Sequence, residues 1–139
     1  MIRNLNEAAA LLRQENRFLI LSHRRPDGDT AGSSAALCRA LRAMGKDAWI
    51  LENPELTPRC TPFWTGLTCA TIPEGAVPVS VDVSSLEMLP KNAESLAGSI
   101  RLCLDHHSSN PGYAEISVIC PDFAAAGELI WFTLDKFLK

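Results

Sequence analysis

The chain has 139 residues, of which 47% are hydrophobic and 21% are charged. This composition excludes a disordered chain, and the length suits one compact domain with a core of its own. The formal net charge of −3 argues against a broad basic surface for gripping duplex nucleic acid. Small or short anionic substrates are compatible with it.

The five cysteines are scattered and contain no Cys-x-x-Cys pair. We therefore expect reduced, buried thiols rather than disulfides or a zinc site. The N-terminus carries charges throughout and lacks the continuous apolar stretch of a signal peptide. No run reaches the roughly 18 apolar residues of a membrane span. These features predict a cytoplasmic protein with no membrane partner.

The first half of the chain alternates between helical and strand patterns. The elements expected there are a helix capped by Asn4, a strand over 18–21, a helix over 30–44 and a strand over 48–51. The first of these strands is uninterrupted and apolar, which is typical of a strand buried on both faces of a parallel sheet. Gly45 marks the end of the second helix.

The second half begins with five prolines in the segment 53–78, which is predicted to be irregular apart from a short strand near 69–72. The elements expected beyond it are strands over 77–83, 100–104 and 117–120, a broken helix over 86–96 and a final helix over 124–138. Strands alternating with helices predict an α/β fold built on a parallel sheet, in one domain over residues 1–139.

Polar side chains follow three of the predicted strands. They are His23 with Asp27 and Asp29, then Asp82, then the triplet at 105–107. Because the carboxyl ends of parallel strands meet at one edge of a sheet, these groups should converge. So many carboxylates repel one another unless cations neutralise them. Carboxylate and imidazole without thiolate suit manganese or magnesium, and two such ions about 3.5 to 4 Å apart would support hydrolysis of a phosphate ester.

Each group also has a purely structural explanation. A single histidine such as His23 is more often a hydrogen-bonded residue at a strand end than a ligand. Asp27 and Asp29 fit a turn followed by a helix cap, and Asp82 could cap a helix starting near Ser85. The adjacent histidines at 106–107 have no obvious packing role, so the groups together favour a metal site.

Three stretches resemble signatures of the DHH phosphoesterase superfamily, and a fourth resembles a helix start of one of its branches. Residues 22–34 read SHRRPDGDTAGSS and contain the first signature, His-x-x-x-Asp-x-Asp. Residues 81–85 read VDVSS, similar to the second, and residues 104–110 read LDHHSSN, similar to the Asp-His-His signature. FAAAGELIW, at 123–131, resembles a helix start of the family's oligoribonuclease and nucleotide-phosphatase branch. The resemblance spans almost the whole chain.

This resemblance implies a three-layer α/β domain that holds two Mn²⁺ or Mg²⁺ ions and attacks with a metal-bound hydroxide. The ligands it implies are His23 and Asp27 for one ion, Asp29 and His106 for the other, and Asp82 as the bridge between them. His107 would face the substrate phosphate, so His107 and Asp82 are the expected catalytic residues.

The implied substrates are small nucleotides, such as 3'-phosphoadenosine 5'-phosphate, or short single-stranded oligonucleotides. Ser108 and Asn110 would shape the phosphate pocket. Arg24 or Arg25 would contact phosphate, since guanidinium pairs well with it, although a solvated loop charge explains these arginines equally well.

The family's fourth signature, an Asp at the end of a further strand, and its C-terminal substrate-binding domain do not occur in the sequence. We therefore expect an incomplete catalytic domain with weak activity of its own and a tendency to form homo-oligomers. Two alternatives stay open. They are an inactive or regulatory module that binds nucleotide or metal, and a manganese-dependent inorganic pyrophosphatase.

Overall fold

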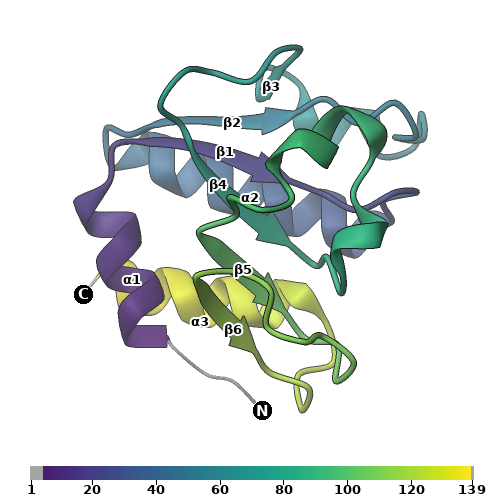
Figure 1. Ribbon diagram of the computed structural model, residues 1–139. Coiled ribbons are helices and arrows are strands. Elements are labelled where there is room, and N and C mark those ends of the chain that lie inside the picture. Colours follow the sequence, from purple (N-terminus) through teal and green to yellow (C-terminus); the bar gives the residue numbers. More distant parts are fainter. Residues whose placement is uncertain (1–4, 139) are drawn as a thin grey trace.

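The computed structural model describes residues 5–138 and shows one sheet of six parallel strands in the order β3-β2-β1-β4-β5-β6 (Figure 1). The strands are β1 Arg17–Leu21, β2 Asp47–Leu51, β3 Thr68–Cys69, β4 Val77–Val81, β5 Leu102–Asp105 and β6 Ile116–Ile119. The predicted α/β class with a parallel sheet is confirmed.

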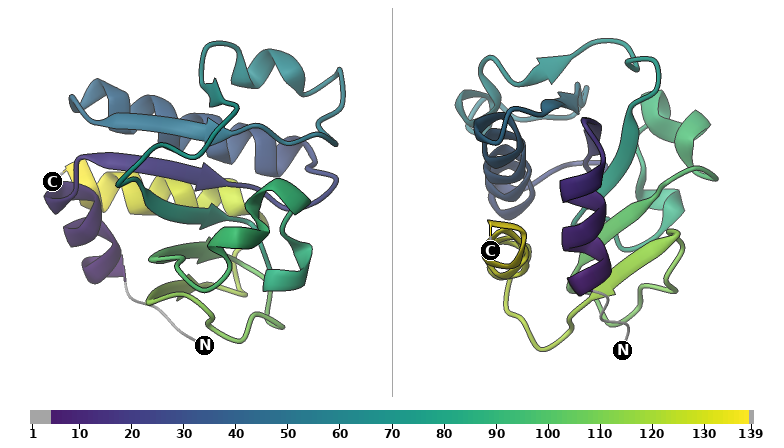
Figure 2. Two further views of the ribbon diagram at one scale, coloured as in Figure 1. Left: turned by 45° about the horizontal axis from the view of Figure 1, so that its top comes forward. Right: turned by 90° about the vertical axis from the view of Figure 1, so that its left-hand side faces the viewer.

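Helices and 3-10 turns cover the two faces of this sheet. The α-helices are α1 Leu5–Gln14, α2 Gly28–Ala43 and α3 Ala126–Leu138, and the 3-10 helices are η1 Thr61–Trp64, η2 Leu86–Met88 and η3 Lys91–Leu96. Figure 2 shows the α-helices on one face, with the green 3-10 segments on the other. The result is the expected three-layer arrangement.

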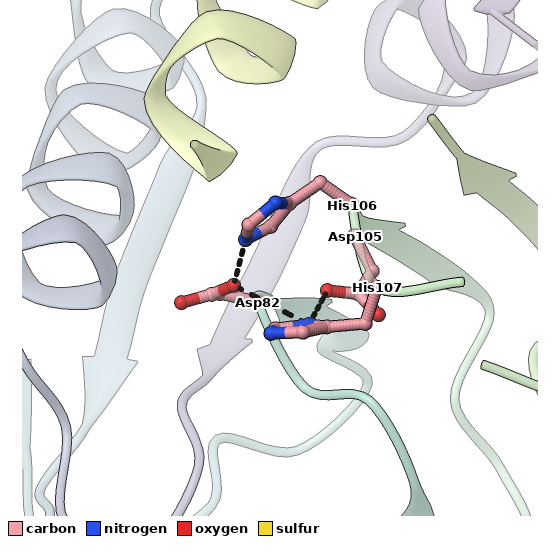
Figure 3. A group of neighbouring side chains, drawn as sticks. All are labelled: Asp82, Asp105, His106 and His107. Atoms are coloured by element: carbon pink, nitrogen blue, oxygen red, sulfur yellow. Dashed lines mark hydrogen bonds and ion pairs between the residues drawn. The ribbon is translucent and has the colours of Figure 1, made fainter. Parts of the chain in front are cut away.

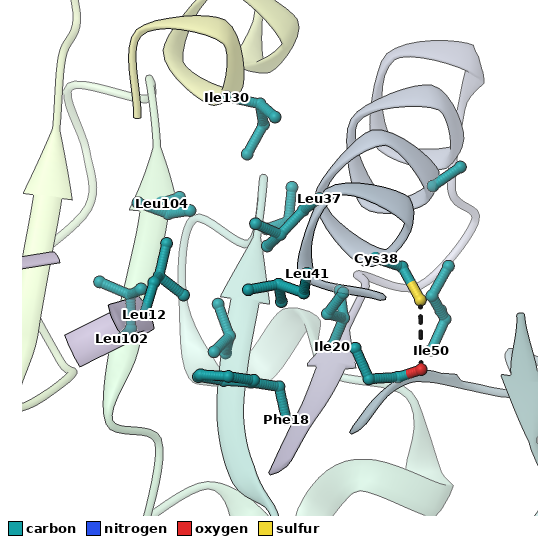
Figure 4. Close-up of a cluster of buried hydrophobic side chains, with 14 of the residues drawn as sticks. Leu12, Phe18, Ile20, Leu37, Cys38, Leu41, Ile50, Leu102, Leu104 and Ile130 are labelled. Carbon is teal, nitrogen blue, oxygen red and sulfur yellow. Dashed lines mark hydrogen bonds between the residues drawn. The ribbon is translucent and has the colours of Figure 1, made fainter. Parts of the chain in front are cut away.

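Alternate residues of β1 divide the core into two parts. Phe18 and Ile20 pack into the cluster beneath the α-helices, part of which is drawn in Figure 4. Leu19 and Leu21 pack on the opposite face against Leu89, which follows η2. Both faces are thus buried, which explains why the strand is apolar at every one of these positions.

The cysteines serve as small core residues. Within residues 5–138 none of the five forms a disulfide, and four of them are buried. Cys38 donates its S–H to the carbonyl of Ala48 at 3.4 Å within the cluster of Figure 4. Burial raises the pKa of the Cys38 thiol, as it does for Cys103, which keeps both groups protonated and unreactive.

Several predicted boundaries shift in the structure. Helix α2 begins at Gly28 rather than at residue 30, because Asp27 caps it by accepting the backbone N–H of Thr30 at 2.9 Å. Strand β4 ends at Val81 rather than at residue 83, because Asp82 adopts a left-handed φ of 64°. The cap predicted at Asn4 lies outside the described residues.

The segment 53–78 is mostly irregular, as predicted, but two details differ. The short strand falls at Thr68–Cys69 instead of near 69–72, and the 3-10 helix Thr61–Trp64 was not predicted. Trp64 explains the second difference. Its indole is 2% exposed and donates to the carbonyl of Ala31 in α2, so a tertiary contact orders this turn.

The chain order creates a switch point between β1 and β4. From β1 the chain runs outward through β2 and β3, then returns to place β4 on the other side of β1. Leu21 pairs with Ser80, so the two strands end next to each other. In open parallel sheets, ligands bind in the crevice beyond such a point. Among residues 5–138, no helix is long and apolar enough to cross a membrane.

Candidate metal centre

The loop between β1 and α2 supplies the first group of polar side chains. His23 and Asp27 reach the hydroxyl of Thr30, whose Oγ1 lies 2.8 Å from His23 Nε2 and 3.0 Å from Asp27 Oδ1. The same hydroxyl donates to Asp82 Oδ2 at 2.6 Å. Thr30 is fully buried. One hydroxyl therefore ties together a histidine and two carboxylates from two different strand ends.

Asp82, at the end of β4, lies at the middle of the site and is 4% exposed. Its backbone N–H donates to the carbonyl of Leu104 at 2.9 Å, which anchors the residue to β5. Aspartate tolerates the left-handed backbone better than most residues do, so the tight turn here is compatible with its side chain.

The end of β5 and the loop after it supply the second group, Asp105, His106 and His107 (Figure 3). His106 Nε2 lies 3.2 Å from Asp82 Oδ1, and His107 Nδ1 lies 3.8 Å from the same oxygen. His107 also donates from Nδ1 to Asp105 Oδ1 at 2.7 Å. Asp82 is the one residue common to both groups.

All three imidazoles are held at Nδ1. The carbonyl of Arg24 accepts from Nδ1–H of His23, and the carbonyl of Phe123 accepts from that of His106 at 3.3 Å. A neutral imidazole then carries its lone pair on Nε2, the nitrogen that faces Asp82 in both residues. Metal-binding histidines show this pattern, in which a second group fixes the tautomer and the ring.

Around Thr30 and Asp82, hydrogen-bond acceptors outnumber the hydrogens that could bond to them. The single hydrogen of the Thr30 hydroxyl faces three acceptors, and Asp82 Oδ1 is buried without a hydrogen-bond partner. Buried acceptors facing one another are unfavourable unless a proton or a metal ion lies between them. The site is therefore short of positive charge.

The pKa shifts of His23 and Asp82 also indicate that the site favours positive charge. The interaction with Asp82 raises the pKa of His23 above its usual value, although burial acts against this. Burial alone would raise the pKa of Asp82, but the interaction with His23, the hydrogen bond from Thr30 and the nearby imidazoles outweigh it and lower the pKa. Asp82 is thus ionised and attracts whichever cation is available.

The donor set fits a hard divalent cation. A cleft of about 420 Å³ is lined by carboxylates and imidazoles, among them His23, Asp27, Asp82, His106 and His107. Carboxylate and imidazole donors without thiolate suit Mn²⁺ or Mg²⁺. His23, Asp27 and Asp82 would hold one ion, while Asp82 and His106 would contribute to a second. We call this space the metal cleft.

Asp29 lines the metal cleft but belongs to neither group of clustered ligands among the described residues. Its two oxygens accept the backbone N–H groups of Ala126 at 2.9 Å and Gly127 at 3.0 Å, at the start of α3. A carboxylate is stabilised at a helix N-terminus, which explains this orientation. Its role as a ligand of the second ion stays a prediction.

Asn110 lies beneath the cleft rather than at its surface. Its buried side chain donates to Asp105 Oδ2 at 2.8 Å and accepts from the backbone N–H of Gly112 at 2.8 Å. The structure thus supports a positioning role, in which Asn110 orients Asp105 and, through it, His107. Ser108, by contrast, is exposed, and its contact with substrate stays a prediction.

The two loop arginines differ in their surroundings. Arg24 donates its guanidinium to the carbonyl of Glu87 and its backbone N–H to the carbonyl of Met88. The side chain of Arg25 is 90% exposed and lies 3.7 Å from Glu55. Arg25 is therefore the arginine that is free to meet a ligand.

Sequence reasoning missed Thr30 and the supporting role of Asp105. Thr30 directly follows the Asp-x-Asp pattern, but nothing in the sequence shows that its hydroxyl reaches Asp82, 52 residues away. Asp105 is fully buried between Asn110 and His107. The apolar strand that precedes it was the available signal of this burial.

Fold and site together define an α/β protein with a carboxylate and imidazole centre at its sheet switch point. The chain belongs to the DHH family, because residues 17–137 match the model of the DHH family, N-terminal domain. It is 32% identical over 130 residues to the bifunctional oligoribonuclease and PAP phosphatase NrnA of Thermus thermophilus. That match covers 92% of the chain and 39% of the relative.

Two solved structures share the fold. An exopolyphosphatase-related protein from Bacteroides fragilis superposes with a TM-score of 0.75 at 22% identity, over 96% of this chain and 43% of that one. Exonuclease RecJ bound to manganese superposes with a TM-score of 0.60 at 20% identity, over 99% of this chain and 38% of that one. The chain thus spans less than half the length of these proteins.

Replacing Thr30 with Val should weaken Mn²⁺ binding by about tenfold, the lower end of what the loss of a partner to metal ligands costs. Valine keeps the shape but removes the hydroxyl that ties His23, Asp27 and Asp82 together. Calorimetric titration with Mn²⁺ measures the effect. Thr30→Ser should restore most of the affinity, because it restores the hydroxyl.

Thr133→Val is the matched control for this experiment. Thr133 is equally buried, but its hydroxyl donates to the carbonyl of Leu129 inside α3. Its replacement should leave the Mn²⁺ affinity unchanged. Equal losses in the two variants would mean that Thr30 acts through general packing and not through the ligands.

Metal affinity should also depend on pH through His23. A protonated Nε2 has no lone pair for a cation, and the pKa of His23 is raised. Above that pKa the affinity should be constant, and below it the affinity should fall about tenfold per pH unit for each proton displaced. Mn²⁺ titrations between about pH 8.5 and 5.5 span this range around the usual histidine pKa. A constant affinity throughout would argue against His23 as a ligand.

Proposed function

We propose that the protein is a two-metal phosphoesterase that hydrolyses short oligonucleotides or small nucleotides, with Mn²⁺ or Mg²⁺ as cofactor. The single observation that carries this proposal is Asp82 Oδ1, which is buried without a hydrogen-bond partner. It lies 3.2 Å from Nε2 of His106 and 3.8 Å from Nδ1 of His107, in rings whose Nδ1 atoms are already bonded. DHH family membership and the similarity to an oligoribonuclease and PAP phosphatase support it.

When bound, the two cations would activate a water molecule and neutralise phosphoryl oxygens. The residues of the chain would hold the cations and orient the substrate phosphate. Asp82 would bridge the two ion positions. The Thr30 hydroxyl contacts both Asp82 and His23 and would hold the two side chains in place. Asp105 accepts a hydrogen bond from Nδ1 of His107 and so orients the ring. With hydrogen on both ring nitrogens, Nε2–H of His107 would donate to a phosphate oxygen.

The test uses Mn²⁺ with three substrates: a dinucleotide, 3'-phosphoadenosine 5'-phosphate and inorganic pyrophosphate. Release of mononucleotide or phosphate should be greatest with the nucleotide substrates and should stop when a chelator is added. Faster hydrolysis of pyrophosphate would favour a pyrophosphatase instead. Metal binding without turnover of any substrate, also in the extended chain described next, would favour a regulatory module.

Because the chain spans 39% of its relative, we expect the 139 residues alone to be a weak enzyme. An extended version that carries the family's fourth signature and the C-terminal domain should turn over faster, since a second domain orients the substrate. Both versions are assayed per molecule with the dinucleotide. Equal rates would show that this chain already contains the whole active site.

A further inference from the structure

Two more cavities are connected to the metal cleft through their lining residues. The first, the arginine pocket, has a volume of about 380 Å³ and is lined by Arg24, Arg25, Glu55 and Met88. Met88 also lines the metal cleft, so the two spaces share a wall. The second, the outer pocket, has a volume of about 450 Å³. Its lining includes Pro54 and Leu56, which flank Glu55 in the sequence.

The outer pocket is tied to the metal site by hydrogen bonds. Asn53 lines the outer pocket, and its buried amide donates to the carbonyl of His23 and to the hydroxyl of Ser22, both at 2.9 Å. Its Oδ1 accepts the backbone N–H of Glu55 at 3.0 Å, which shapes the loop between the two pockets. A ligand that bridges the cleft and the outer pocket would thus follow one connected wall.

The outer pocket combines an apolar floor with a polar rim. Leu56 and the buried indole of Trp64 supply apolar surface, while Glu52, Thr68 and Asn92 supply carboxylate, hydroxyl and amide groups. Sites for small organic ligands have this composition, with few polar groups that fix orientation. A nucleobase fits it, because it is flat and apolar on its faces and carries donors and acceptors on its edge.

The arginine pocket shares Met88 with the metal cleft and contains Glu55, the chain neighbour of Pro54 and Leu56 of the outer pocket. Its arginines suit the anionic part of such a ligand. The guanidinium of Arg25 is exposed and forms an ion pair with Glu55 at 3.7 Å. An exposed ion pair of this length is weak, so a phosphate can replace it at little cost. The positive charge of Arg25 is therefore available to the sugar-phosphate part of such a ligand.

We propose that the outer pocket is a nucleoside subsite, which takes the base and ribose of the nucleotide unit next to the phosphate held in the metal cleft. The proposal rests on the proposed function and deepens it by assigning a place in the fold to the nucleoside part of the substrate. Inorganic pyrophosphate would leave the outer pocket empty.

The test is a ¹⁵N NMR titration of the 139-residue chain with Mg²⁺ and the 5'-phosphorylated diadenylate pApA, with the ³¹P spectrum confirming that the probe is intact. Ribose 5-phosphate is the probe without a base. We expect pApA to shift the amide signals of Thr30 and His106 in the cleft and of Gly66 and Thr68 at the outer pocket. Ribose 5-phosphate should shift the cleft signals alone.

Two variants separate the pocket from the cleft. Thr65→Trp places a large ring at the exposed rim of the outer pocket and should weaken pApA binding by about tenfold, a clear loss of one contact. Its affinity for ribose 5-phosphate should not change. Thr71→Trp adds the same ring at an exposed position that does not line the pocket, and should bind pApA like the unmodified chain.

Shifts confined to the cleft with pApA, or equal losses in the two tryptophan variants, would overturn the subsite. Failure of the proposed function looks different. In that case neither probe shifts the cleft signals of Thr30 and His106 in the presence of Mg²⁺. If pApA still shifts Gly66 and Thr68, the outer pocket binds a nucleoside without phosphoester chemistry beside it.

Discussion

Replacing Asp82 with Asn should lower the Mn²⁺ affinity of the chain by more than about 100-fold, since even the outer partners of metal ligands are worth about 10- to 100-fold. Asp82 is the one carboxylate shared by both groups of clustered side chains. Its Oδ2 lies with Thr30 and His23, and its Oδ1 lies 3.2 Å from His106 Nε2. An amide removes the charge from both positions at once.

Asparagine is the informative substitution because it tolerates the left-handed backbone conformation of this position. Asp82 has a φ of 64°, which Asn adopts readily, whereas Ala pays about 1 to 2 kcal/mol there. Asp82→Ala should therefore lose the metal and some stability, while Asp82→Asn should lose mainly the metal. Urea unfolding in a chelator measures the stability of each variant.

Calorimetry with Mn²⁺ gives the affinities, and Glu94→Ala is the control. Glu94 is an exposed carboxylate on η3 and lines none of the cavities described above. Its loss should change neither affinity nor stability. Unchanged Mn²⁺ binding in Asp82→Asn would remove the bridging role and, with it, the two-metal proposal.

Replacing Asn110 with Leu should lower the free energy of unfolding by about 3 kcal/mol, the largest effect we expect on stability alone. Asp105 is fully buried, and the Asn110 amide donates to its Oδ2 at 2.8 Å. Without that donor, one carboxylate oxygen is buried with no strong partner. The Gly112 N–H loses its acceptor as well.

Asn92→Leu provides the comparison for this variant. Asn92 also donates its amide to a protein carbonyl, that of Glu52 at 2.6 Å, but it is exposed, so water can replace the bond. We expect a loss below about 1 kcal/mol there, and urea unfolding in a chelator measures both variants. Similar losses at the two positions would show that burial of Asp105 is not what makes Asn110 important.

A double variant tests whether Asp105 is the residue through which Asn110 stabilises the fold. In the double variant Asp105→Leu with Asn110→Leu, both the buried carboxylate and its donor are gone. Its loss of stability should be smaller than the sum of the two single losses, since removal of both partners leaves less unpaired polar surface. Strict additivity would mean that the two side chains do not stabilise each other.

The sequence by itself determined the layers and the residue types at the strand ends. Strands β1, β4 and β5 are read from short apolar runs, because a strand buried on both faces must be apolar on both. The histidines and carboxylates that follow them are local features of the chain. Their convergence follows from the rule that parallel strands end at a common edge.

Only the tertiary structure decided which of these groups meet. The Asp29 carboxylate accepts from backbone N–H groups 97 and 98 residues further along the chain, and the Thr30 hydroxyl reaches Asp82 across 52. Such pairings depend on strand order and helix placement, which no local pattern encodes. The burial of Asn110, whose amide also donates to the carbonyl of Val83, and the order of Thr61–Trp64 depend on contacts between distant segments for the same reason.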